Sequence, residues 1–260
     1  MRIVTWNVNS LKARGHHVAD YLDAVRPDVI GLQELKMVDE VVPRELFEER
    51  GYHLATHGQK TYNGVALASL APLEDVETGL EGGDEGQSRL IAATTAGVRI
   101  VNLYCPQGSA VDSSKFPYKL NFYAALTRWM GEVLSRHEEA VVIGDLNIAP
   151  LPDDVWDPEE MKDQVSFHPL EHAAWAKLLS LGLHDAAKPF LPSRTFTFWD
   201  YRQASFRRKR GMRIDHVLVS EALRECVVAA EVHREERKKE KPSDHAPLLV
   251  ELDRTRMLAL

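Results

Sequence analysis

Short apolar runs alternate along the chain with amphipathic stretches, a pattern that predicts strands interleaved with helices. Ten runs have the length and the aliphatic content of strands, and they cover 2–6, 29–33, 64–69, 89–95, 98–104, 140–144, 195–199, 214–219, 226–232 and 246–252. Four stretches have the apolar spacing of helices, and they cover 16–25, 44–50, 114–137 and 169–181. Only Ala96 and Gly97 separate two of the strand runs, which predicts a hairpin there.

The number of strands relative to helices predicts how they are layered. A single sheet of this size would leave one face uncovered, whereas two mixed sheets packed face to face, with helices on both outer surfaces, would bury all the apolar runs. No Pro/Gly/Ser-rich linker divides the chain. We therefore predict an α/β fold, a four-layer α/β sandwich, as a single domain over residues 1–260 with a C-terminal tail at 253–260. Long loops at 79–87, 149–168 and 201–211 would border a cleft.

Composition limits the environment in which the protein acts. The first residues already have strand character, and no apolar run approaches the ~20 residues that cross a bilayer, so we expect no leader segment and no membrane partner. Cys105 and Cys226 lie in apolar surroundings, which favours a reduced cytoplasmic protein over a disulfide scaffold. No sticky surface patch is evident, so a monomer is expected. The net charge of −7 argues against a passive nucleic-acid binder, although basic residues crowd together at 207–213.

Five of the strand-like runs end on side chains that suit metal binding or acid–base chemistry. These ends are at 5–7, 32–34, 144–147, 213–216 and 243–245. Taken singly, Asn7 and Asn147 could be turn residues, and the neighbouring Asp and His residues could form structural ion pairs. Together, oxygen ligands and an imidazole at five strand ends indicate a site for a hard divalent cation and a phosphate. An acidic cleft repels DNA unless it holds a cation, so the pattern favours a metal-dependent nuclease.

Eight motifs, in order along the chain, match a known family. They are TWNVNS at 5–10, LQELK at 32–36, QKTYNGVA at 59–66, NLYCPQG at 102–108, GDLNIAP at 144–150, TFWDYR at 197–202, GMRID at 211–215 and SDHAP at 243–247. On these motifs the chain resembles the exonuclease III type of abasic-site endonuclease, within the endonuclease/exonuclease/phosphatase superfamily. The resemblance implies a two-sheet sandwich that cleaves DNA phosphodiesters with Mg²⁺, for which Mn²⁺ could substitute. The implied partner is double-stranded DNA with abasic sites, cut on their 5′ side, or with blocked or normal 3′ ends, so the protein would be nucleoid-associated when bound to DNA.

The resemblance and the chemistry of the side chains together predict two overlapping sets of residues, one that binds the metal and one that is catalytic. The metal set is Asn7, Glu34, Asp145, Asn147, Asp244 and His245. The catalytic set is Tyr104, Asp145, Asn147, Asp215 and His245. Glu34 is the expected direct ligand, and Asp215 would orient the His245 ring and favour its charged form. Asp145 would align or deprotonate the attacking water, but the identity of the base and the number of metal ions stay open.

DNA contacts are expected from side chains outside this acidic group. Phe198, Trp199 and Met212 would form a pocket for a flipped-out, base-free sugar. The other expected contacts are to backbone phosphates, and they are Arg207, Arg208, Lys209 and Arg210, with Lys60, Asn63, Ser88 and Arg89 as weaker candidates.

Other motifs have simpler explanations. His168 and His172 are four residues apart, but Pro169 makes His168 a helix cap and not a zinc ligand. The mixed-charge run 234–241 is interpreted as an exposed face, and the Gly-rich segment 79–86 lacks the Gly-Lys-Ser/Thr of a nucleotide-binding loop. Two other functions stay open: a hydrolase of phospholipid, inositol phosphate or RNA tails, and a catalytically silent DNA-binding scaffold.

Overall fold

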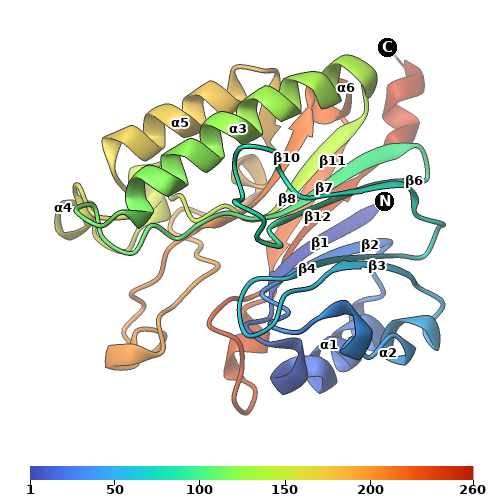
Figure 1. Cartoon of the computed structure of the whole chain (residues 1–260), viewed down its shortest axis with the longest axis horizontal. Helices are drawn as coiled ribbons and strands as arrows, with labels where there is room; N and C mark the ends of the chain where they lie inside the picture. Colours follow the sequence, from blue (N-terminus) through green and yellow to red (C-terminus); the bar gives the residue numbers. More distant parts are fainter. Residues whose placement is uncertain (260) are drawn as a thin grey trace.

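Two six-stranded sheets, stacked face to face, form the centre of the molecule, and helices cover their outer faces (Figure 1). The computed structural model describes residues 1–259. The first sheet has the strand order β11-β12-β1-β2-β4-β3. Its strands are β1 Arg2–Asn7, β2 Val29–Gln33, β3 His53–His57, β4 Val65–Ser69, β11 Val227–Val232 and β12 Leu248–Leu252. The predicted four-layer α/β sandwich is confirmed.

The second sheet has the strand order β5-β6-β7-β8-β10-β9. Its strands are β5 Glu74–Thr78, β6 Leu90–Thr95, β7 Val98–Tyr104, β8 Ala140–Asp145, β9 Leu183–Asp185 and β10 Asp215–Ser220. Each sheet contains one parallel pair, β1 with β2 and β7 with β8, and every other pair is antiparallel. A helix connects each parallel pair, as a parallel connection requires.

Six α-helices and several 3-10 turns lie outside the sheets in the part of the chain described here. The α-helices are α1 Leu11–Val25, α2 Glu45–Glu48, α3 Lys115–Arg136, α4 Pro158–Met161, α5 Pro169–Leu179 and α6 Glu221–Arg224. The 3-10 turns are η1 Asp39–Val41, η2 Pro152–Asp154, η3 Lys188–Phe190, η4 Arg202–Ala204, η5 Arg234–Lys238 and η6 Arg254–Ala259. None of the helices described is long and apolar enough to cross a membrane.

Three apolar layers hold the sandwich together. The inner layer, between the sheets, includes Ile3, Val29, Ile91, Ile143 and Val250. A second layer joins the second sheet to α3 and α5 and includes Leu103, Phe122, Met130, Val142 and Trp175. A third joins the first sheet to α1 and α2 and includes Val4, Trp6, Leu22 and Phe47. Apolar side chains on both faces of each sheet explain why the central strands appear in the sequence as continuous apolar runs.

The structure differs from the predicted elements mainly at sheet edges. β3, β5 and β9 were not predicted, and each of them is an edge strand. Edge strands need fewer apolar residues, and β5 has the sequence Glu-Asp-Val-Glu-Thr. The strand predicted at 195–199 is wrong, because Phe198 makes only isolated bridges, to Met212 and to His245.

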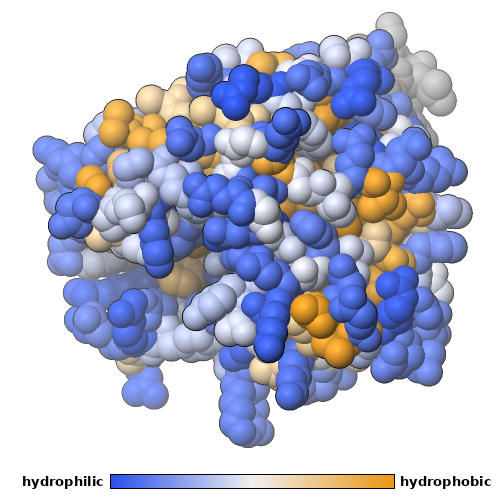
Figure 2. Space-filling model, in the orientation of Figure 1, coloured by the Kyte–Doolittle hydropathy of each residue, from blue (hydrophilic) through white to orange (hydrophobic). Residues whose placement is uncertain are grey.

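Several local predictions can be compared directly with the structure. The hairpin between β6 and β7 is confirmed, with Ala96 and Gly97 at φ values of +48° and +81°. Cys105 and Cys226 are buried free thiols. The tail predicted at 253–260 is partly helical, and Arg254 pairs with Glu139 at 2.8 Å, whereas residue 260 lies outside the described residues. On the face shown in Figure 2, apolar residues form small separate patches among hydrophilic ones.

Candidate active site

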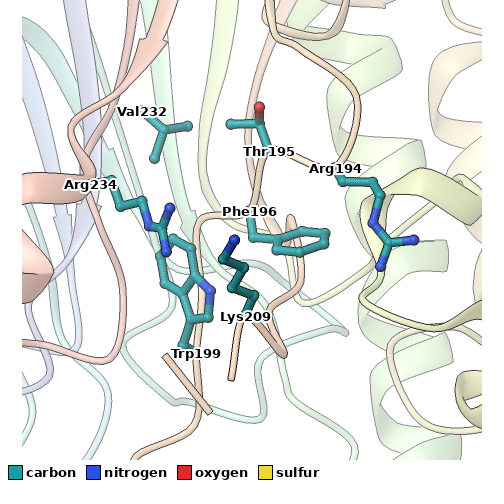
Figure 3. Close-up of a pocket in the computed structure, with 7 residues that line it drawn as sticks. All are labelled: Arg194, Thr195, Phe196, Trp199, Lys209, Val232 and Arg234. Carbon is teal, nitrogen blue, oxygen red and sulfur yellow. The ribbon is translucent and has the colours of Figure 1, made fainter. Parts of the chain in front are cut away.

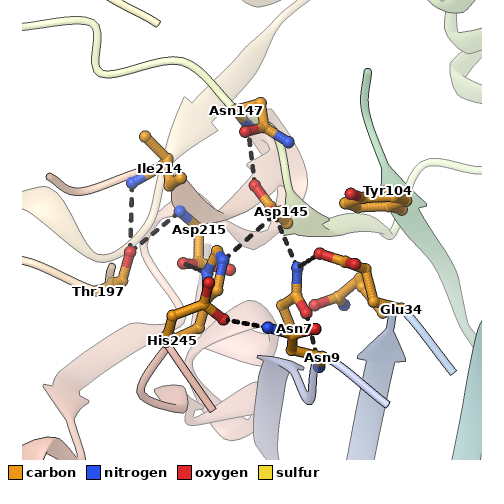
Figure 4. Close-up of polar contacts among 12 residues, drawn as sticks. Asn7, Asn9, Glu34, Tyr104, Asp145, Asn147, Thr197, Ile214, Asp215 and His245 are labelled. Atoms are coloured by element: carbon orange, nitrogen blue, oxygen red, sulfur yellow. Dashed lines mark hydrogen bonds and ion pairs between the residues drawn. The ribbon is translucent and has the colours of Figure 1, made fainter. Parts of the chain in front are cut away.

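Strand ends from both sheets meet at one edge of the sandwich and bring five polar side chains together (Figure 4). Asn7 ends β1, Glu34 follows β2, Asp145 ends β8, Asp215 begins β10, and His245 precedes β12. Strands β10 and β12 run antiparallel to their neighbours β8 and β1, so their beginnings lie beside their neighbours' ends. The register aligns Asp215 with Asp145 directly. The alternation of strand directions therefore assembles residues from both halves of the chain.

A buried acid–imidazole group lies at the centre of this edge. His245 Nδ1 is 2.8 Å from Asp215 Oδ2, and His245 Nε2 is 3.6 Å from Asp145 Oδ2. Burial alone would lower the pKa of His245, but the charges of Asp215 and Asp145 raise it to about 10. Burial raises the pKa of Asp145 to about 7, against the opposing charge of His245. The ring is therefore a cation at neutral pH, next to a carboxyl group that is close to its titration point.

The Asn7 amide links this group to a third carboxylate, that of Glu34. Asn7 Nδ2 donates to Glu34 Oε1 at 2.8 Å and to Asp145 Oδ2 at 2.9 Å. Glu34 Oε2 pairs with Lys36 Nζ at 2.9 Å. Burial would raise the pKa of Glu34, but the Asn7 hydrogen bond and the Lys36 charge lower it below its ordinary value. Glu34 is thus a stable anion.

The donors fit a hard divalent cation. Ligand atoms of Asp145, Asp215 and His245 lie within 4.8 Å of one another, and the carboxylates of this buried group could hold a metal ion, whereas the charged His245 ring would not be a ligand as predicted. Asp215 Oδ1 is buried and, among residues 1–259, has no hydrogen-bond partner. Carboxylate oxygens of this kind, with Glu34 and the Asn7 amide oxygen alongside, are the ligands that Mg²⁺ or Mn²⁺ prefers.

Two members of the predicted metal set make other contacts. Asp244 is half-buried, and its Oδ1 accepts a hydrogen bond from Asn9 Nδ2 at 3.0 Å. Asn147 donates its side-chain amide to Cys105 O at 2.9 Å and its backbone N–H to Asp145 Oδ1 at 3.1 Å. Asn147 has a φ of +53°, a left-handed conformation that asparagine tolerates better than most residues. It therefore orients Asp145 within the turn that follows β8.

Tyr104 lies at the end of β7, opposite Asp145 in the sheet register. The Arg89 guanidinium is 5.0 Å from the centre of its ring, and Arg89 Nη1 donates to the Tyr104 carbonyl oxygen at 3.1 Å. Burial and the nearby Glu34 and Asp145 carboxylates raise the pKa of Tyr104 well above its ordinary value. The phenol therefore stays protonated and can donate a hydrogen bond.

A buried lysine that the sequence analysis missed holds the turn after β8. Lys119 of α3 is fully buried, and its Nζ donates to Asn147 O at 2.6 Å and to Gln107 O at 3.2 Å. The same ammonium pairs with Glu171 of α5, which is also fully buried. The α3 helix therefore fixes the backbone that carries Asp145 and Asn147. Lys119 lies three residues after the buried Phe116 and four before the buried Tyr123, a spacing that places it on the inner face of the helix.

We expect Lys119→Met to destabilise the fold by about 3–5 kcal/mol, because it leaves the Glu171 carboxylate buried without its cation. Urea unfolding followed by circular dichroism measures this effect. The double variant Lys119→Met/Glu171→Gln removes both charges and should recover most of the loss. Equal stability of the single variant and the wild type would contradict the role assigned to this pair.

The predicted pocket for a base-free sugar is only partly correct. Phe198 and Met212 line a hollow of about 350 Å³ together with Trp156, Met161 and Arg210, called here the Met212 hollow. The Phe198 ring is 4.9 Å from the His245 ring, so the hollow adjoins the acid–imidazole group. Trp199 is only 2 % exposed and does not line this hollow. Trp156 lines the hollow in the place predicted for Trp199. The Arg210 guanidinium lies 4.2 Å from the centre of the Trp156 ring.

The remaining predicted DNA contacts are dispersed. Asn63, Arg89 and Tyr104 line a hollow of about 490 Å³ with Tyr62 and Tyr118. Lys60, Arg207 and Arg208 are exposed outside it, and Lys209 lines a separate hollow. The Ser88 hydroxyl is buried and donates to Gly58 O at 2.9 Å, so its side chain has a structural contact.

The two histidines that were weighed as zinc ligands have structural partners. His168 Nδ1 accepts from Leu170 N at 3.1 Å and caps α5, as predicted, whereas His172 Nε2 contacts Ala149 O at 3.0 Å. Both side chains thus serve the loop and helix around 149–172.

Comparison with known proteins gives similarity over nearly the whole chain. The family described as Endonuclease/Exonuclease/phosphatase family matches residues 4–245. Exodeoxyribonuclease III of Haemophilus influenzae is 37 % identical over 96 % of this chain and 99 % of its own. The 3′ phosphatase NExo from Neisseria, solved bound to a product DNA hairpin, is 43 % identical with a TM-score of 0.95, covering 97 % of this chain and 99 % of its own. An AP endonuclease from Archaeoglobus fulgidus is 37 % identical with a TM-score of 0.92 over 97 % of this chain and 99 % of its own.

Proposed function

Because the chain belongs to the endonuclease/exonuclease/phosphatase family, and within it to the exonuclease III group, we propose that it cleaves DNA at abasic sites and at 3′ ends with a bound divalent cation. Members of this group are DNA repair nucleases and 3′-phosphatases, and this chain is an exonuclease III-type phosphodiesterase. The observation that carries the proposal is the buried group of Asp145, Asp215 and His245, which meets Asn7 and Glu34 at one sheet edge.

The residues of this edge can each take one part of phosphodiester hydrolysis. Asp145 is next to the imidazolium and has a pKa near neutrality, so it is suited to orient or accept a proton from the attacking water. His245, kept cationic by Asp215, stabilises the negative charge on the phosphate oxygens. Tyr104 can donate its phenol proton in a hydrogen bond to the phosphate or to the departing oxygen. Asn147 keeps the Asp145 carboxylate in place.

Glu34, Asp145 and Asn7 would hold the cation, with Asp244 available beside Asn9. When bound, Mg²⁺ or Mn²⁺ neutralises phosphate charge and supports the leaving oxygen. The cation also offsets the acidity of the cleft, which would otherwise repel DNA.

The Met212 hollow supports an abasic sugar as one substrate group. One part of its lining is apolar, with Trp156, Met161, Phe198 and Met212, and the Phe198 ring lies beside the imidazole. The rest of the lining is polar, with Asp200, Arg202, Gln203, Ser205 and Arg210. A sugar without a base is smaller than a complete nucleotide, so it can enter a hollow that excludes a nucleotide with its base. The names of the relatives support both a 3′-end and an abasic-site activity.

Two labelled duplexes test the proposal, one with a single abasic-site analogue and one with a recessed 3′-phosphate, each incubated with Mg²⁺. The proposal expects incision 5′ to the lesion in the first and phosphate release in the second. If only the 3′-phosphate is released, the proposed abasic-site activity is wrong. If neither product forms, the proposal as a whole is contradicted.

We expect Phe198→Ala to lower abasic-site incision by about 10–100-fold and 3′-phosphate release much less, because the first reaction alone needs a sugar held in the Met212 hollow. Steady-state kcat/KM values on the two duplexes measure the change. Phe190→Ala serves as the control, since Phe190 is exposed and lies in η3 outside the hollow. An equal loss on both substrates would show that Phe198 acts through His245 and not through the sugar.

Nothing described in the structure favours the two other functions. A catalytically silent scaffold would not need the complete set of acid, base and amide groups seen here. A lipid phosphodiesterase would be expected to present an apolar membrane-facing surface, and the face in Figure 2 shows only small separate apolar patches.

A further inference from the structure

A second hollow, of about 310 Å³, is called here the Arg234 hollow (Figure 3). Trp199 and Lys209 line it, whereas the adjacent residues Phe198 and Arg210 line the Met212 hollow. Its lining residues are Arg194, Thr195, Phe196, Trp199, Lys209, Val232 and Arg234. Three of these seven residues are cationic and none is acidic. In Figure 3 the Lys209 ammonium points into the space between the Arg234 guanidinium and the Phe196 ring. A chain with a net charge of −7 thus concentrates positive charge at one concave place.

The cations of this hollow are free of carboxylate partners. Among residues 1–259, none of Arg194, Lys209 and Arg234 forms an ion pair. The two glutamates that follow Arg234 in the sequence pair with other cations: Glu235 with Lys238 at 2.7 Å and Glu236 with Lys239 at 2.8 Å. The positive potential of the hollow is therefore not neutralised locally.

Aromatic rings restrain Arg234 and the neighbouring Arg237. The guanidinium groups of Arg234 and Arg237 each lie 4.9 Å from the centre of the Phe206 ring, which comes from the basic loop 201–211. Arg234 also lies 5.6 Å from the centre of the Trp199 ring. Such contacts leave the donor groups of Arg234 available while they restrict its side chain. Arg194 is restrained in a different way, by donating to the backbone carbonyl of Trp156.

A buried cation contacts the backbone of Trp199, one of the residues that line the hollow. Arg237 is only 7 % exposed, and its Nη2 donates to Trp199 O at 3.2 Å. In the described part of the chain its Nε has no acceptor, and no carboxylate pairs with it. A buried guanidinium without an anion is costly, and an anion bound in the neighbouring hollow would offset part of that cost. The interpretation of 234–241 as an exposed face is therefore wrong at Arg237.

We propose that the Arg234 hollow binds a phosphate group, supplied by a DNA strand that runs past the catalytic edge. Arginine and lysine are the usual ligands of phosphate, and the hollow presents three of them around an apolar floor. The basic loop would then contribute to two places at once, with Arg210 at the Met212 hollow and Lys209 at the Arg234 hollow. The DNA source of the phosphate rests on the proposed nuclease function, whereas the phosphate site itself does not.

The phosphate site is tested by NMR with inorganic phosphate. The chain has five tryptophans, so its indole N–H signals are few, and Trp199→Phe identifies the one from the hollow. Added phosphate should shift the Trp199 signal saturably, and Lys209→Gln/Arg234→Gln should weaken that binding at least about tenfold. The control Arg128→Gln/Lys177→Gln changes the net charge equally on α3 and α5 and should bind like the wild type. A Trp199 signal that moves no more than that of Trp129, on α3, would overturn the site.

The DNA source is tested by the salt dependence of duplex binding in EDTA, where no cleavage interferes. Each phosphate contact adds about 0.9 to the slope of log K against log salt, so the hollow variant should lose about 1–2 from the slope and the control nothing. If the slope is unchanged while inorganic phosphate still binds, the phosphate does not come from a DNA strand. The hollow would then be a site for free phosphate or a mononucleotide. Because this measurement needs no turnover, loss of the nuclease activity and loss of the phosphate site are distinguishable.

Discussion

Asp145→Asn should lower the rate of incision at an abasic site by about 10²–10⁴-fold while duplex binding in EDTA stays nearly unchanged. The asparagine has the same shape and can still accept a hydrogen bond from Asn7, so the edge stays assembled. What it loses is the group whose pKa lies near 7, and with it the ability to accept the proton of the attacking water. Single-turnover incision and fluorescence anisotropy measure the two quantities.

The control for this variant is Asp153→Asn, which removes a half-buried carboxylate paired with Lys188 and should leave the rate unchanged. A wild-type rate in Asp145→Asn would show that another group activates the water. Loss of duplex binding together with activity would mean that Asp145 acts in assembling the site and not in the chemical step.

Asp215→Asn should make activity fall at a lower pH on the alkaline side of the pH profile. The carboxylates of Asp215 and Asp145 hold the pKa of His245 at about 10, so the charged ring persists until the pH rises through that value. Without the Asp215 charge, burial dominates and the pKa of the ring falls, so the cation is lost at a lower pH. We expect the alkaline limb of kcat/KM to move down by more than about one pH unit, which lowers kcat/KM at pH 10 at least about fivefold relative to the wild type.

A matched control exists for this pH profile. Glu221 pairs with His184 at the surface, so Glu221→Gln removes a carboxylate from a histidine outside the site. That variant should keep the profile of the wild type. An alkaline limb in Asp215→Asn at the wild-type position would contradict the assignment of His245 as the group that must be charged.

Most of the fold could be predicted because the interior strands are buried on both faces. Runs such as 140–144 stay apolar throughout, whereas β5, with an exposed edge, shows no such run. The number of sheets followed from the need to cover apolar faces, but their strand order did not follow from the sequence. A single domain over residues 1–260 stays a prediction.

The site residues could be proposed from their positions at strand ends, but their distances could not. Sequence positions 145 and 215 become neighbours only through the antiparallel register of β8 with β10. Trp199 does not line the Met212 hollow as predicted, because successive side chains of an extended segment point to opposite sides. Phe198 and Trp199 are consecutive, so only one of them could line the Met212 hollow. Trp156 comes from a loop whose path the sequence does not specify.

Lys119 shows a different limit. A lysine in a helix is normally solvated, and only the opposing carboxylate of Glu171, more than fifty residues later, makes its burial acceptable. Its spacing from Phe116 and Tyr123 was a usable signal, but the partner was visible only in the folded chain.

The central claim is that this sheet edge hydrolyses DNA phosphodiesters with the help of a divalent cation. The most direct measurement is single-turnover incision of a duplex with one abasic-site analogue, first in EDTA and then after excess Mg²⁺ is added to the same sample. The account predicts no product in EDTA and rapid product after Mg²⁺ addition. Incision at the same rate in both conditions would contradict it.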